Sequence, residues 1–95
     1  MIERHVTFAV LPDKARDFEK FFVEQYRPAM AVMPGYIKVE LLCEQENPGK
    51  YQMVIRFESL EAAAAWRSSD AHQALQPKIK ALYRNSQLQI YNVIA

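Results

Sequence analysis

The sequence is poor in residues that cross-link or bind metals. It has one cysteine, Cys43, and two histidines, His5 and His72, among 95 residues. A single thiol forms no intrachain disulfide, which favours a reducing compartment, and we expect a cytoplasmic protein. The two histidines stand apart from each other and from the thiol, so we expect no metal site. Small domains without these supports commonly gain stability by oligomerisation, and we expect a homodimer.

An excess of charge of one sign is also missing. Twelve Lys and Arg face eleven Asp and Glu, for a net charge of +1. This balance removes the electrostatic argument for nucleic-acid binding. Glu3, Arg4 and His5 stand where a signal peptide needs an apolar core, and no apolar stretch approaches the roughly twenty residues that span a bilayer. We expect neither nucleic acid nor a membrane as a partner.

The rest of the composition is that of one folded domain. Hydrophobic residues make up 51% and charged residues 24%, close to the globular average. No repeat or low-complexity linker divides the chain. We expect a single domain over residues 1–95.

Only two glycines occur, and both mark turns. Pro34-Gly35 and Asn47-Pro48-Gly49 bracket a segment that alternates apolar and polar residues. A second alternating segment runs from residue 51 to residue 57, so the two segments predict an antiparallel hairpin. Cys43 ends the apolar row of the first segment, which predicts a buried structural thiol rather than a nucleophile.

The flanking segments predict two further strands and the helices. Alternation predicts a strand at residues 6–10, and a last strand is predicted at residues 88–94. Between the first strand and the hairpin, an apolar stripe indicates a helix capped by Asp13, with a kink or a break near Arg27 because Pro28 removes a hydrogen bond. Ser59 is expected to cap a second helix, and Ser69 or Asp70 a third. The two stripes are Phe18, Phe22, Tyr26, Ala29 and Met33, then Ala71, Ala74, Leu75, Ile79 and Leu82.

This order predicts an α+β fold of the ferredoxin-like βαββαβ type, an antiparallel sheet with helices on one face. The helix-facing set would be entirely apolar: Val6, Phe8, Val10, Ile37, Val39, Leu41, Met53, Ile55, Phe57, Leu88 and Ile90. The opposite face mixes polar residues with Leu11, Leu42, Val54 and Tyr91. Such a mixed surface suits face-to-face dimerisation.

Two familiar nucleic-acid and nucleotide-binding motifs do not fit this sequence. Residues 49–57 are similar to the third strand of an RNA recognition motif, but Tyr51 and Phe57 fall on the helix-facing set and would be core residues. A glycine-rich phosphate loop is absent, which removes the motifs of Rossmann-type and P-loop nucleotide binding.

One stretch carries a family resemblance. An aromatic-Glu-Ser sequence enters the helix at 57–59, Trp66 follows Ser59 by seven residues, and Ser69-x-x-His72 forms the next junction. Together with Pro34-Gly35-Tyr36, these features resemble the antibiotic biosynthesis monooxygenase family. The resemblance covers essentially the whole chain and implies a dimeric α+β barrel.

The resemblance also implies a chemistry. Family members include enzymes that oxidise electron-rich aromatics such as quinols without a cofactor, by deprotonating a substrate that then reacts with oxygen. His72 would be the base or hydrogen-bond partner, and Trp66, Tyr83 and Tyr26 would line the substrate pocket. The ordinary alternatives remain open: Trp66 as a core anchor and His72 as a locally bonded helix residue. Arg56 would serve association if it points to the open face of the sheet.

Two other interpretations compete with oxidation. The heme-degrading branch carries an Asn in the first strand and a heme-ligating His ten residues beyond the Trp, where this chain has Gln76 and no Asn. His72 would point about 40° away from that position, at roughly 100° per residue, which disfavours heme degradation. The rival from another class is a non-catalytic dimeric barrel that binds a small apolar ligand. Enzyme activity, substrate identity and pathway stay open at the level of the sequence.

Overall fold

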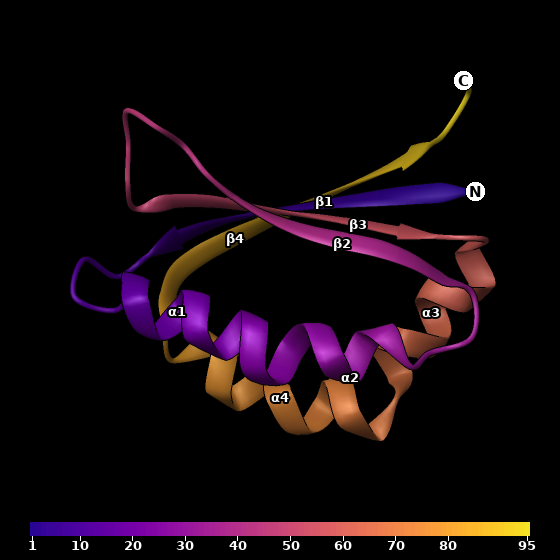
Figure 1. The fold of residues 1–95 in the computed structure, drawn as a ribbon, viewed down its shortest axis with the longest axis horizontal. Helices are drawn as coiled ribbons and strands as arrows, with labels where there is room; N and C mark the ends of the chain where they lie inside the picture. The colour runs from indigo at the N-terminus through magenta and orange to yellow at the C-terminus, as the bar shows by residue number, and fades with distance from the viewer.

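Four antiparallel strands form one sheet, and all the helices pack on the same face of it in the computed structural model, which describes residues 1–95 (Figure 1). The strands lie in the order β2-β3-β1-β4 and span Ile2–Val10 (β1), Tyr36–Cys43 (β2), Lys50–Phe57 (β3) and Tyr83–Asn92 (β4). The helices are α1 (Ala15–Phe21), η1 (Phe22–Tyr26), α2 (Arg27–Ala31), α3 (Leu60–Ser68) and α4 (Asp70–Lys80). The predicted ferredoxin-like α+β fold is confirmed. No helix combines the length and the apolarity that a membrane crossing requires.

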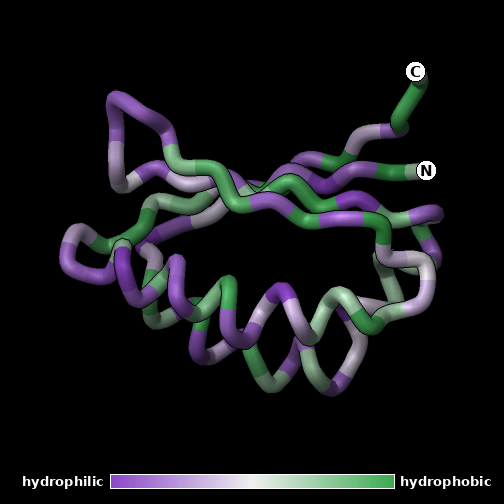
Figure 2. The backbone as a smooth tube through the Cα atoms, in the orientation of Figure 1, coloured by the Kyte–Doolittle hydropathy of each residue, from purple (hydrophilic) through white to green (hydrophobic).

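The hairpin predicted from the two alternating segments is present. β2 and β3 pair in register Val39 to Ile55 and Leu41 to Met53, and residues 44–49 form the connecting loop. This loop is the strongly hydrophilic tip at the upper left of Figure 2. Tyr51 and Phe57 are buried core residues, as predicted.

Three predictions about the strands are corrected. The last strand starts at Tyr83 rather than Leu88, because pairing with β1 extends it through a polar segment without apolar alternation. The register shifts between Tyr36 and Lys38, which leaves Ile37 exposed instead of helix-facing. Cys43 is exposed too, since it ends an edge strand, where its Sγ lies 3.3 Å from the Pro48 carbonyl oxygen.

The first helix is continuous where a kink was predicted. α1, η1 and α2 follow one another with right-handed helical backbone angles at each junction (Figure 1). A π-helical turn precedes Pro28, and the Arg27 N–H bonds the Phe22 carbonyl five residues earlier. The helix accommodates the missing N–H of Pro28 by widening into this π-helical turn, so it does not break. Asp13 does not cap the helix, because the N-cap residue is Lys14 and its side chain makes no capping bond.

The two later helices begin at the predicted serines. Ser59 Oγ accepts a hydrogen bond from the Ala62 amide at 3.1 Å. Ser69 Oγ accepts one from the His72 amide, also at 3.1 Å, so Ser69 rather than Asp70 caps α4. The buried stripe of α4 is narrower than predicted, because its two predicted alanines, at positions 71 and 74, are exposed.

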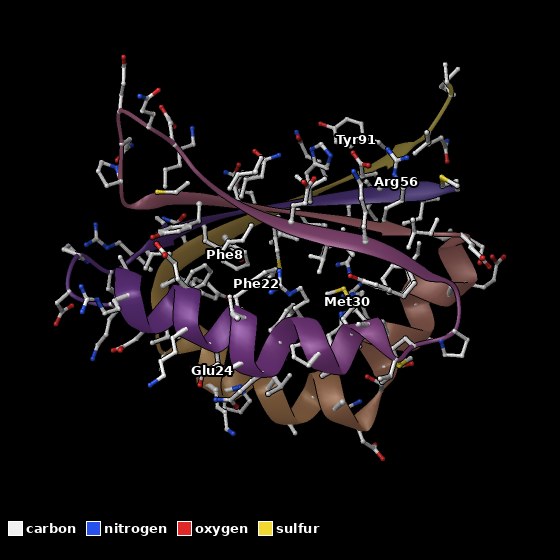
Figure 3. The ribbon with its side chains drawn as sticks, in the orientation of Figure 1. Phe8, Phe22, Glu24, Met30, Arg56 and Tyr91 are labelled. Carbon is white, nitrogen blue, oxygen red and sulfur yellow. The ribbon has the colours of Figure 1, made fainter.

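The core is a layer of aromatic and sulfur-bearing side chains between the sheet and the helices. Figure 3 shows Phe8, Phe22 and Met30 in this layer and Glu24 on the outer side of the helices. The largest fully buried side chains are Trp66, Phe18, Phe57, Met30, Met53 and Ile55. Each aromatic side chain buries about 150–250 Å², so this layer supplies much of the hydrophobic stabilisation.

The other face of the sheet carries a polar network. Arg56 Nε donates to Glu3 Oε2 at 2.8 Å, and His5 Nε2 lies 2.8 Å from Glu3 Oε1. Gln52 Nε2 lies 3.1 Å from His5 Nδ1, so the network crosses β3 and β1. Arg56 and Tyr91 project away from the helices in Figure 3. The sequence prediction that Arg56 points to the open face is confirmed.

Gly35→Ala should destabilise the protein by about 2 kcal/mol or more, because Gly35 has φ of +83° and an added Cβ would lie 2.6 Å from the Ala62 Cβ. Gly49→Ala is the matched control, since its Cβ would meet nothing nearer than the Val10 carbonyl at 3.5 Å. Urea denaturation measures both variants. Equal losses of stability in the two variants would contradict this explanation.

Candidate functional site

A cavity of about 280 Å³ lies between the sheet and the helices. β1, β3 and β4 form its roof, and η1, α3 and α4 form its walls. This volume is near the lower end of small-molecule sites and suits a ligand of one or two rings. The lining residues are Arg4, Val6, Phe8, Tyr26, Ile55, Arg67, His72, Gln76, Ile79, Lys80, Tyr83, Ser86 and Leu88.

Arg4 is the buried cation of this cavity. It shares the parity of Ile2, Val6 and Phe8 in β1 and therefore faces the helices. Only 7% of the residue is exposed, its Nε has no hydrogen-bond partner, and none of the protein's four ion pairs includes it. Burial, followed by the nearby charge of Arg67, lowers the pKa of Arg4, but a guanidinium keeps its proton at neutral pH. Arg4 thus presents an unpaired positive charge to the cavity.

His72 faces the same space from the first turn of α4, where the Ser69 cap fixes its backbone. Its Nε2 lies 3.0 Å from Nε2 of Gln76. An amide nitrogen can only donate, so the imidazole Nε2 accepts this bond. Burial and then the charge of Arg4 lower the pKa of His72 below its ordinary value of 6.5, so the ring is neutral at physiological pH. A neutral imidazole with an accepting nitrogen can take a proton from a ligand.

Two tyrosines form the aromatic part of the wall. Tyr26 comes from the π-helical turn η1, and Tyr83 opens β4 and packs on Phe8 with ring centroids 5.0 Å apart. Burial raises the pKa of Tyr26, and the charge of Arg4 offsets part of this rise. The Tyr26 phenol therefore stays protonated at neutral pH and can donate a hydrogen bond.

Trp66 is not part of the cavity lining. It is fully buried in α3, with its ring edge-on to Tyr26 at 5.6 Å and to His72 at 5.0 Å. Among the four residues that the sequence predicted for the site, the structure brings His72, Tyr26 and Tyr83 to one cavity and places Trp66 behind them. From there Trp66 supports the rings that face the cavity.

Sequence reasoning missed two residues of the site, Arg4 and Gln76. The signal for Arg4 was its parity, because a charged residue in the buried row of a strand is rare and needs a reason. The prediction of an entirely apolar helix-facing set is therefore wrong. Leu88 and Ile90 share the register of the helix-facing row, yet 41% and 49% of their surfaces are exposed on the edge strand β4.

A larger hollow, of about 380 Å³, lies where the hairpin loop meets the start of β4. Its charged residues, Lys50 and Arg84, are exposed, and it contains no buried titratable group. We place the site at the smaller cavity because Arg4 and His72 give it reactive chemistry. No group of three or more His, Cys, Asp or Glu residues is arranged to hold a metal ion.

Residues 1–78 match the family model of the antibiotic biosynthesis monooxygenases. The chain belongs to this family. The match includes β1, with Arg4, and most of α4, with His72 and Gln76, but ends before β4. A search of the curated proteins finds no match.

Solved structures share the fold along nearly the whole chain. A protein from Nitrosomonas europaea assigned to the antibiotic biosynthesis monooxygenases superposes with a TM-score of 0.88 at 16% identity, covering 100% of both chains. SnoaB, a cofactor-independent oxygenase from Streptomyces nogalater, gives 0.89 at 17% identity over 99% of this chain and 93% of its own. A conserved protein from Methanosarcina mazei gives 0.86 at 19% identity over 95% and 89%. At these identities the similarity establishes the fold alone.

Arg4→Met should raise the pKa of His72, because the variant removes a positive charge that disfavours the imidazolium. Burial remains, so the pKa should stay below its ordinary value of 6.5. NMR titration of the His72 ring protons measures this shift. Arg16→Met, on the exposed side of α1, should leave the titration unchanged. An unaltered His72 titration in Arg4→Met would show that Arg4 does not act on the ring.

The same depressed pKa makes stability depend on pH. The folded state resists protonation of His72 more than the unfolded state does, so the free energy of unfolding falls as the pH drops from about 6.5 through the folded-state pKa. His72→Gln should lose this part of the slope in urea titrations between about pH 7 and pH 5. His5→Gln, the matched control, should keep it.

Proposed function

We propose that the protein is a cofactor-independent monooxygenase that oxidises a small aromatic or quinol in the cavity beneath β1 and β4. One observation carries the proposal: a neutral, hydrogen-bond-accepting His72 and the positive charge of Arg4 face one aromatic-walled cavity. Membership of the antibiotic biosynthesis monooxygenase family and the fold shared with SnoaB, a cofactor-independent oxygenase, support it.

The chemistry starts with deprotonation of the substrate. His72 Nε2 takes the proton of a phenolic hydroxyl, after that hydroxyl has displaced the Gln76 amide from the ring nitrogen. The resulting anion is rich enough in electrons to reduce O₂ directly. A C–O bond forms at the ring carbon to give a peroxide anion, which takes back the proton from His72. The resulting hydroperoxide loses water to leave a carbonyl. Overall, the keto form of the phenol, written R₂CH₂, reacts with one O₂ to give R₂C=O and one H₂O.

The other residues bind and stabilise. Positive potential from Arg4 favours the anion over the neutral phenol, since a charge in a water-poor cavity acts strongly. Tyr26 and Tyr83 hold the aromatic ring, and the protonated Tyr26 hydroxyl is available as a donor. Trp66 acts as a positioning residue behind Tyr26 and His72.

A non-catalytic barrel that binds a small apolar ligand is the second candidate. Its specific support is that the Gln76 amide already occupies the His72 nitrogen. Against it, the helix-facing row of the sheet contains Arg4, and a buried cation is poorly suited to a purely apolar ligand.

Oxygen uptake with a panel of quinols and phenols separates the two functions. The wild type should consume oxygen faster than the buffer control, and His72→Ala should lower the enzymatic rate about 100-fold or more, as expected for loss of a general base. Gln73→Ala changes an exposed neighbour on α4 and should leave the rate unchanged. Absence of wild-type uptake across the panel would overturn the enzymatic proposal.

We also propose that the open face of the sheet forms a homodimer interface. This face combines the network of Glu3, His5 and Arg56 with half-buried Val54 and with Tyr91, 44% of which is exposed. A neighbouring copy would cover these apolar residues and give a small domain the burial that it lacks alone.

Val54→Asp should convert the dimer to a monomer, because it places an unpaired carboxylate in the centre of that face. Light scattering at micromolar concentration should give twice the mass of one chain for the wild type and for Val32→Asp, the same change on the helical layer. A monomeric wild type would contradict the interface.

A further inference from the structure

The charges that line the cavity are all of one sign. Arg4, Arg67 and Lys80 are among the lining residues, and no Asp or Glu is. The protein as a whole carries nearly equal numbers of both signs, so the composition alone does not produce this asymmetry. None of the three cations takes part in an ion pair within the chain.

Arg4 differs from the other two because it is buried. Arg67 and Lys80 are exposed, so solvent and salt screen their charges. Arg4 has no such screening, and its Nε is a buried donor without a partner. A buried cation without a counter-charge destabilises a folded protein. A ligand that supplies the missing anion would offset part of this destabilisation on binding.

The neutral groups around Arg4 are arranged to receive the same ligand. His72 is uncharged, and the Tyr26 phenol is protonated, so neither supplies an anion. Phe8, Tyr26 and Tyr83 give aromatic walls, and the volume of about 280 Å³ accepts two fused rings. The cavity therefore combines an aromatic-walled space with one buried positive charge.

We infer that the ligand of this cavity is an aromatic acid whose carboxylate pairs with Arg4. The guanidinium offers a planar set of N–H donors that matches the two oxygens of a carboxylate. A neutral quinol of the same size would leave the guanidinium unpaired and forgo this interaction. The inference rests on the proposed function for the location of the site and narrows its substrate class to hydroxyaromatic carboxylates.

The test compares two ligands that differ only in charge. 2-Naphthoate and 2-naphthamide have the same rings and nearly the same shape, and neither is oxidised, so isothermal titration calorimetry measures binding alone. Wild type should bind the naphthoate about 10- to 100-fold more tightly, as expected for a charge-assisted hydrogen-bonded pair. This preference should persist at high salt, because Arg4 is buried. Equal affinities, a preference for the amide, or no binding of either ligand would overturn the inference.

Variants assign the preference to one residue. Arg4→Met keeps the volume but removes the charge and should abolish the preference. Arg4→Lys keeps the charge but loses the bidentate geometry, so it should retain a weaker preference for the naphthoate. Arg16→Met, an exposed arginine on α1, should behave as wild type. A preference that survives in folded Arg4→Met would refute the assignment, and the wild-type comparison remains decisive if that variant does not fold.

Failure of this inference can be told apart from failure of the proposed function. A naphthoate preference without oxygen uptake on any hydroxyaromatic acid would leave an acid-binding protein that is not an oxygenase. Uptake on neutral quinols with no naphthoate preference would leave an oxygenase with a different substrate class.

Discussion

The four-residue spacing of large side chains along the first helical rod governs the packing of the whole molecule. Phe18, Phe22, Tyr26 and Met30 follow one another at steps of four, and all four are buried. In a regular α-helix each such step advances the side chain by about 40°, so the last would lie about 120° from the first. The π-helical turn between Phe22 and Tyr26 is wider and takes up this drift. Without it, Tyr26 and Met30 would rotate away from the sheet.

This phasing also builds the site. Tyr26 ends the π-helical turn and packs against Trp66 on one side while it lines the cavity on the other. Trp66 in turn packs against His72, which the Ser69 cap holds at the start of α4. The groups that face the cavity therefore depend on contacts in the core, so a substitution at Trp66 would change the position of the His72 imidazole.

Much of this architecture follows from local rules, and the predictions that depended on them succeeded. Alternation identified the hairpin, and Ser59 and Ser69 cap helices because their hydroxyls accept amide hydrogen bonds at the expected spacing. The failures at Ile37 and Cys43 come from a register shift and a strand end, both of which depend on the partner strand. Trp66 shows the same limit, since helical spacing identifies a buried face without saying whether a cavity or the core lies beyond it.

At Arg4 the residue type and the position in the strand disagree. Its parity in β1 places it in the buried row, while its charge conflicts with that position. Residues whose type does not suit their burial concentrate at functional sites, where a protein accepts lower folding stability to keep a group that binds or reacts. The unpaired guanidinium is the clearest such conflict in the structure.

The charge of Arg4 has two opposing effects on the proposed proton transfer: it lowers the basicity of His72, and it raises the acidity of a bound hydroxyl. Burial and then the charge of Arg4 lower the pKa of His72, so the ring is neutral and able to accept a proton, but it is also a weaker base. For a bound hydroxyl the effect is the reverse, because a nearby cation stabilises the anion and makes the hydroxyl a stronger acid. Proton transfer becomes easier only if the ligand oxygen lies closer to Arg4 than the imidazole does. A carboxylate paired with Arg4 would fix the position of the ring, but it would also compensate most of the Arg4 charge. In such a complex Arg4 orients the ligand, the pKa of His72 rises towards its ordinary value, and the imidazole becomes a stronger base for the reacting hydroxyl.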